Sequence, residues 1–250
     1  SILSKKLAEG IDALVLDVKV GRGAFMKTED AARQLAESLV RVGTGAGLKV
    51  RALLTRMEEP LGRMIGNALE VREAIDILKG QGPSDTTELT LELGSEMLCL
   101  AGAISDTRAG RDKVREAIRS GAGLDKFKAL IQAQHGDPTV ADDPDRLPTA
   151  THKTEVKAAS AGVITAVDSY AIGMAAMQLG AGRSRAEDTV DPAVGIEVLH
   201  TVGEEVTENE PLAVVHHNGP AEDVLPRVRE AFTVGPEPTS RGPIVLDRIG

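Results

Sequence analysis

The feature that most constrains the fold is a strand–helix–strand pattern within residues 11–55. Residues 11–20 (IDALVLDVKV) form a nearly continuous apolar run with alternating charge at its far end, which predicts a buried strand. Residues 29–43 carry apolar side chains at helical spacing, behind Thr28 as a plausible helix N-cap. Residues 48–55 (LKVRALLT) predict a second strand, so this stretch is a βαβ unit and the region is α/β.

The remainder of the chain divides into a helical part and a strand-rich part. Residues 66–135 indicate three or four helices. Residues 136–148 (GDPTVADDPDRLP) combine Pro, Asp and Gly without periodicity, which is typical of a linker. After the linker, short β-branched runs alternate with turns, and one helix near residues 169–179 interrupts them.

We therefore expect an α/β fold with two domains. Residues 1–150 should form a mixed-sheet α/β region that opens with a helix over residues 1–9. Residues 151–250 should form a small β-rich C-terminal domain like a barrel-sandwich hybrid. Residues 151–217 also resemble the biotinyl and lipoyl carriers, which leaves a carrier or interaction module as an alternative. A carrier needs a lysine at a hairpin tip, however, and the nearest local sequence, GMAAMQLG, contains none.

Composition excludes several classes of function. The net charge is −9, and with three Phe, one Tyr and no Trp the chain lacks the basic, aromatic surfaces that bind nucleic acid. The apolar runs are far shorter than the roughly 18 residues of a membrane span, and we expect no secretory signal. The single cysteine, Cys99, cannot form an internal disulfide, so we expect a cytoplasmic protein. Because the chain opens on Ser1 in mid-helix pattern, we also expect it to be a piece of a longer protein.

Two N-terminal segments could bind a ligand. Ser1 and Lys5 share one face of the predicted helix with Ile2 beside them, although spacing alone favours an ordinary solvated face. The loop over residues 21–26 (GRGAFM) begins like a glycine-rich phosphate loop but lacks the third glycine. Phe25 follows in this loop either as a core plug or as the wall of a pocket, and pattern alone favours the core.

A third segment, residues 58–75 (EEPLGRMIGNALEVREAI), places a tight turn before a helix that contains Glu73. Carbonyl oxygens freed in such a turn, beside a carboxylate, suit a hard cation, although pattern alone favours simple capping. The five histidines lack the spacing of metal ligands. Local context indicates no Ser-His-Asp or Cys-His arrangement, so no nucleophile or general acid is evident.

Three motifs, taken together and in order, carry a family resemblance: SILSKKLAEGIDALVLDVKVGRGAFMKT, PLGRMIGNALEVREAI and AVGIEVLHTVGEEV. They resemble the pyrimidine-nucleoside phosphorylases, a family that includes thymidine phosphorylase, over essentially the whole chain. The resemblance implies that Ser1, Ile2, Lys5 and Phe25 contact the pyrimidine base. It also implies a potassium site formed by the backbone carbonyls of Leu61 and Met64 and by Glu73.

The family reaction is the reversible phosphorolysis of a pyrimidine (deoxy)ribonucleoside to free base and pentose 1-phosphate. It implies a pyrimidine nucleoside and phosphate as substrates, no required cofactor beyond a possible potassium ion, and a homodimer in the complete protein. The family's phosphate loop and its base-site histidine and arginine precede the matched region, so we expect this chain to be inactive alone. A phosphorylase with another base, or a phosphoribosyltransferase of the same fold, remains an alternative, and the preference between thymidine and uridine stays open.

Overall fold

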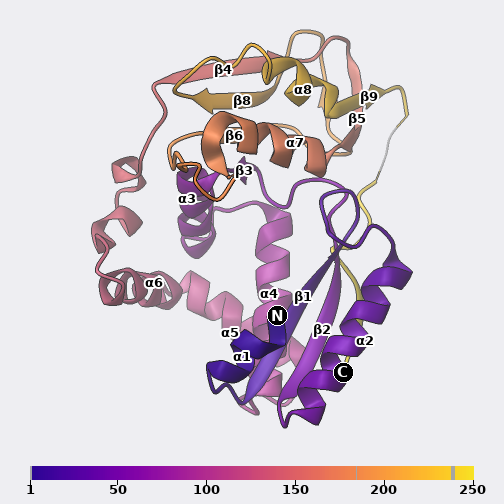
Figure 1. The fold of residues 1–250 in the computed structure, drawn as a ribbon, viewed down its shortest axis with the longest axis vertical. Helices are drawn as coiled ribbons and strands as arrows, with labels where there is room; N and C mark the ends of the chain where they lie inside the picture. Colours follow the sequence, from indigo (N-terminus) through magenta and orange to yellow (C-terminus); the bar gives the residue numbers. More distant parts are fainter. Residues whose placement is uncertain (1, 184, 238–239) are drawn as a thin grey trace.

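The computed structural model describes residues 2–183, 185–237 and 240–250. Figure 1 shows a β-rich part at one end of the molecule, joined to an α/β part in which a sheet stands beside a group of helices. The predicted α/β fold with a β-rich C-terminal part is confirmed. In the described ranges, no helix has both the length and the apolar content needed to cross a bilayer.

The first sheet has three strands in the order β1-β2-β10. Strands β1 (Ala13–Val20) and β2 (Lys49–Arg56) pair in parallel and are joined by helix α2 (Glu29–Gly45), as the sequence predicts. Helix α2 begins where Thr28 accepts a hydrogen bond from the Ala31 N–H. Its buried alanines, Ala32 and Ala36, pack on the sheet because the opposite face of the helix is polar.

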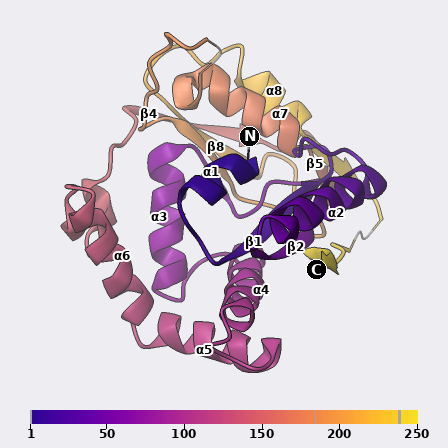
Figure 2. The same ribbon diagram turned by 60° about the horizontal axis from the view of Figure 1, so that its bottom comes forward.

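The helical part confirms the prediction of three or four helices. It consists of α3 (Asn67–Leu78), α4 (Ser84–Leu100), α5 (Thr107–Arg119) and α6 (Ala122–Ala133). Figure 2 shows α4, α5 and α6 following one another in an arc that begins beside the sheet. The short helix α1 (Ile2–Ala8) precedes β1. Helix α4 packs against β1 and β2. The predicted linker contains two 3-10 turns, Pro138–Ala141 and Pro144–Arg146.

The β-rich part contains two open sheets in the described residues. The first has the order β3-β6-β8-β4, with bounds Met64–Ile65, Gly195–Val198, Pro211–His217 and His152–Lys157. The second has the order β7-β5-β9, with bounds Glu205–Val206, Gly162–Val167 and Phe232–Gly235. The predicted helix near residues 169–179 is α7 (Ser169–Ala176), which continues as a π-helical turn (Met177–Ala181). Helix α8 (Leu225–Glu230) packs, like α7, against the hydrophobic core of the β-rich part.

The structure differs from the predicted division at residue 150 in two places. Strand β3 lies in the first half of the chain but pairs antiparallel with β6 of the β-rich part. Strand β10 (Val245–Ile249) lies at the end of the chain but pairs antiparallel with β2 of the first sheet. Each segment crosses over because its backbone groups find their hydrogen-bond partners in the other region. The two regions are therefore interlocked and are not consecutive.

Candidate functional site

The structure brings two of the predicted base-site residues, Ile2 and Phe25, to the wall of one cavity. This cavity of about 320 Å³ runs along β1 and is also lined by Met26 and Met57. Ile2 is 51% exposed and Phe25 is 93% exposed, so neither is a core plug. The interpretation of Phe25 as core, which pattern alone favoured, is wrong.

The other two predicted base-site residues are not placed at this cavity. Ser1 lies outside the described residues. Lys5 is exposed and does not line the cavity, although it lies three positions after Ile2 and so on a neighbouring face of α1. Leu3 is the buried residue that anchors this short helix. The structure therefore groups Ile2 with Phe25 and leaves Lys5 at the surface of the same helix.

Sequence reasoning missed two charged residues that line this cavity. Asp17 and Lys19 project from β1, and the Lys19 Nζ lies 2.8 Å from Asp17 Oδ2. The buried hydroxyl of Thr55 donates to the other oxygen of Asp17. The Lys19 ammonium is buried, and no described residue accepts a hydrogen bond of good geometry from it. The alternating charge at the end of the predicted strand was the only sequence signal for this pair.

The loop after β1 turns sharply because of its glycines. Gly21 has φ = 124°, a conformation that side chains disfavour, and its N–H donates to the Met26 carbonyl at 3.0 Å. The Gly23 N–H donates to the Met57 carbonyl, also at 3.0 Å, which ties the loop to the end of β2. Phe25 is thereby presented at the carboxyl ends of two parallel strands, where α/β proteins bind ligands.

The three residues of the predicted potassium site line a second cavity. Leu61, Met64 and Glu73 all contribute to this space of about 360 Å³. The Glu73 side chain reaches back from α3, and its Oε2 accepts the N–H groups of Arg63 at 2.7 Å and Met64 at 3.1 Å. The turn closes on this carboxylate because Gly62 has φ = 74° and no side chain.

The carboxyl group of Glu73 has a raised pKa at this turn. Glu73 is only 8% exposed, and burial raises the pKa of its carboxyl group. The nearby carboxylates of Asp85 and Glu70 raise this pKa further, against the lowering effect of the two backbone N–H donors. Among the described residues no group of three His, Cys, Asp or Glu side chains could hold a metal ion. Any cation at this turn would therefore depend on backbone oxygens.

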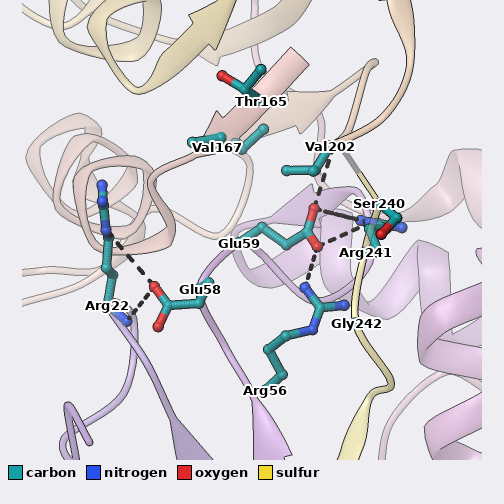
Figure 3. Close-up of a pocket in the computed structure, with 11 residues that line it drawn as sticks. Arg22, Arg56, Glu58, Glu59, Thr165, Val167, Val202, Ser240, Arg241 and Gly242 are labelled. Carbon is teal, nitrogen blue, oxygen red and sulfur yellow. Dashed lines mark hydrogen bonds and ion pairs between the residues drawn. The ribbon is translucent and has the colours of Figure 1, made fainter. Parts of the chain in front are cut away.

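A third cavity, of about 220 Å³, lies between the end of β2 and the β-rich part (Figure 3). Its floor is Glu59, which is 6% exposed and accepts hydrogen bonds from Arg56, Arg241 and the Val202 N–H. Figure 3 shows both guanidinium groups converging on this carboxylate from different segments. On the opposite wall Arg22 lies 3.8 Å from Glu58. The charges are mutually satisfied, so this cluster fastens two regions together.

Comparison with known proteins agrees with these features. A model described as "Glycosyl transferase family, a/b domain" matches residues 1–124, and one described as "Pyrimidine nucleoside phosphorylase C-terminal domain" matches residues 163–235. The pyrimidine-nucleoside phosphorylases of Staphylococcus aureus strains USA300 and NCTC 8325 are each 48% identical over all 250 residues. The chain spans 57% of the length of these relatives.

The structure also bears on the carrier alternative. Residues 173–180, where a carrier would need its lysine-bearing hairpin, lie in α7 and the π-helical turn. The C-terminal domain model and the identity over all 250 residues point to a single family, in agreement with the three sequence motifs. The chain therefore belongs to the pyrimidine-nucleoside phosphorylase family.

Proposed function

We propose that the protein catalyses the reversible phosphorolysis of pyrimidine (deoxy)ribonucleosides, with phosphate as co-substrate and free base and pentose 1-phosphate as products. The observation that carries this proposal is the cavity that joins Ile2 of α1 to Phe25 of the glycine loop. An apolar slot of this kind fits a flat heterocycle, and both residues fall in motifs of the family. We further propose that the complete protein acts in the cytoplasm as a homodimer, on the basis of the family resemblance alone.

Catalysis requires that the negative charge accumulating on the departing base be stabilised. A lysine ammonium near a base carbonyl does this, because its attraction grows as the bond to C1′ breaks. Lys5 lies one turn along α1 from Ile2, and its long flexible stem can carry the ammonium to the mouth of the cavity. We assign this role to Lys5 on the strength of the motif.

The test compares two neighbouring lysines in the complete protein, with thymidine and uridine as alternative substrates. Lys5→Ala should lower kcat/KM by about 10²–10³-fold, as loss of a group that stabilises developing charge does. Lys6→Ala is the matched control, because Lys6 only pairs with Glu9 at 3.1 Å on the helix surface. A Lys5→Ala variant within threefold of wild type would remove Lys5 from the base site.

We also propose that the turn over residues 61–64 holds a potassium ion. The support is that Leu61, Met64 and Glu73 line one space, and that backbone carbonyl and carboxylate oxygens are the donors that suit a large hard cation. Burial and the nearby carboxylates of Asp85 and Glu70 raise the pKa of Glu73, and a bound cation would favour its charged form. The ion would fix the turn and take no part in bond breaking.

Thermal unfolding of the complete protein in KCl and in LiCl at equal ionic strength tests this site. An ion present at 100 times its dissociation constant stabilises the folded state by about 2.7 kcal/mol. The Tm should therefore be higher in KCl, and Glu73→Gln should abolish the difference. Rubidium-soaked crystals should show anomalous density beside Glu73. Equal Tm values in the two salts, together with no such density, would exclude the site.

A further inference from the structure

The loop that carries Phe25 is held by the β-rich part of the molecule through a shared hydrogen-bond acceptor. The Met57 carbonyl oxygen accepts the Gly23 N–H at 3.0 Å and lies 2.8 Å from the Ser169 hydroxyl oxygen. The same hydroxyl lies 2.9 Å from the Glu58 carbonyl oxygen, so its single proton is shared between the two carbonyls. Ser169 is 7% exposed, and burial strengthens such a polar junction.

The backbone of the loop also presses directly against Ser169. A Cβ atom on Gly23 would lie 2.5 Å from the Ser169 Oγ and 2.8 Å from its Cβ. These separations are well inside van der Waals contact, so only glycine allows the loop to approach this closely. The close approach of the first residue of α7 therefore requires a glycine at position 23, in addition to any requirement of the turn itself.

Two further contacts flank this junction. Arg22 Nη1 lies 3.6 Å from Asp168 Oδ2, and Asp168 also caps α7 by accepting the Ala171 N–H. The Lys27 ammonium lies 5.2 Å from the centre of the Tyr170 ring. Each of these exposed contacts is weak alone. Together with the contact between Gly23 and Ser169, they join three consecutive positions at the start of α7 to the loop.

The loop and the acceptor both belong to the proposed base cavity. Phe25 stands at 93% exposure between two of the tethered positions. The side chain of Met57 lines the same cavity, while its carbonyl oxygen accepts the two hydrogen bonds described above. A shift of the loop would therefore move the aromatic ring relative to Ile2 on the opposite wall.

We propose that Ser169, supported by Asp168, is a positioning residue for the base pocket: the start of α7 fixes the loop over residues 21–27 and so sets the affinity for the nucleoside. The identity of the ligand rests on the proposed function, whereas the fixing of the loop does not. Ser169 does not line the cavity beside Ile2 and Phe25. Its effect is therefore expected in nucleoside binding and not in the chemical step.

The first test measures loop order without reference to activity. Residues 1–250 contain no tryptophan, so Phe25→Trp introduces a fluorescent reporter at the loop that no other tryptophan of this segment obscures. In this background Ser169→Ala should lower the tryptophan anisotropy, because it removes the hydroxyl that ties the loop to α7. Ser105→Ala, which alters an exposed serine bonded only to Asp106, is the matched control. Equal anisotropy in all three proteins would overturn the proposal.

The second test uses the complete protein and separates binding from chemistry. Ser169→Ala should raise KM for the nucleoside about five- to tenfold, the cost of one net hydrogen bond, with kcat and the KM for phosphate within twofold of wild type. A fall in kcat with unchanged nucleoside KM would contradict a positioning role. If no nucleoside is cleaved at all, the proposed function fails, and the anisotropy measurement still decides whether α7 orders the loop.

A third comparison tests the contact itself and guards against misfolding. Gly23→Ala should raise nucleoside KM in the wild-type background but have a smaller effect in a Ser169→Gly background, where the two closest atoms are absent and only the Met57 Cγ at 3.2 Å remains. Thermal unfolding of each variant confirms that it folds. Equal effects of Gly23→Ala in both backgrounds would show that the Gly23–Ser169 contact does not control the pocket.

Discussion

Replacing Arg241 with methionine should loosen the attachment of the C-terminal segment to the first sheet. The Arg241 Nε lies 2.9 and 3.0 Å from the two carboxylate oxygens of Glu59, and Nη2 lies 2.8 Å from Oε2. Nη2 also lies 3.6 Å from Asp85 Oδ2 (Figure 3 shows the Glu59 contacts). Methionine keeps most of the apolar stem and removes only the charge and its donors.

The size of the effect follows from the burial of Glu59. Removing one partner of a buried ion pair typically costs about 3–5 kcal/mol, because the other charge is left uncompensated. Glu59 is 6% exposed, and in the variant it would keep Arg56 and the Val202 N–H as partners. These remaining partners offset part of the cost, so we expect a loss of about 2–3 kcal/mol in the free energy of unfolding.

Urea unfolding followed by circular dichroism measures this change. Arg146→Met is the control, since Arg146 pairs with Asp137 at an exposed site where such pairs contribute at most about 1 kcal/mol. The double variant Glu59→Gln/Arg241→Met should lose less stability than the sum of the two single variants, because both single variants break the same ion pair. A loss below about 0.5 kcal/mol for Arg241→Met, or additive losses in the double variant, would refute the assignment of Glu59 as a buried charge held by Arg241.

Two further measurements test local features. Gly62→Ala should destabilise the fold by about 2 kcal/mol or more, because it adds strain at positive φ and places a Cβ 2.0 Å from the Glu73 Oε1. Gly10→Ala is the control, because Gly10 also has a positive φ but has nothing within 4 Å of its added Cβ. This control should cost only about 1 kcal/mol. The Thr139 hydroxyl and N–H, with Arg146, lower the pKa of Asp137 from 3.8 to about 2, so its contribution to stability is complete above pH 3.8 and is lost as the pH falls through about 2. Carboxyl NMR should give a midpoint near 2, and a midpoint near 3.8 would mean that the cap at Asp137 does not form in solution.

The elements that the sequence predicted well are those with long, regular patterns. Strands β1 and β2, helix α2 and the four helices that follow each carry enough apolar residues for the period to be clear. Strand β3 is only two residues long, so it has no period to detect. Strand β10 is long enough to notice, but its partner β2 is chosen by tertiary packing, which no local pattern reveals.

The candidate site divides in the same way. Ile2, Phe25 and Glu73 were found because they stand in family motifs, and the structure places them beside cavities. The Glu59–Arg241 pair was missed because its members lie 182 residues apart, and each alone resembles an ordinary surface charge. Ser169 was missed for a related reason. It is a helix-start serine by sequence, and only the fold shows that its hydroxyl faces the end of β2.

The exchange of strands between the two regions explains why the proposed cation site and the cavity beside Phe25 both depend on the β-rich part. Arg63 lies inside the proposed cation turn, and while its N–H donates to Glu73, its guanidinium lies 2.7 Å from Glu204 and also donates to the Leu199 carbonyl. Its carbonyl oxygen accepts the Val198 N–H at 2.7 Å, so the backbone and the guanidinium of this residue are both in use. Ser169 holds the Phe25 loop from the same side. A movement of the β-rich part would therefore displace the cation turn and the base loop together, because both are fastened to it by buried or half-buried polar groups whose bonds are costly to leave unmade.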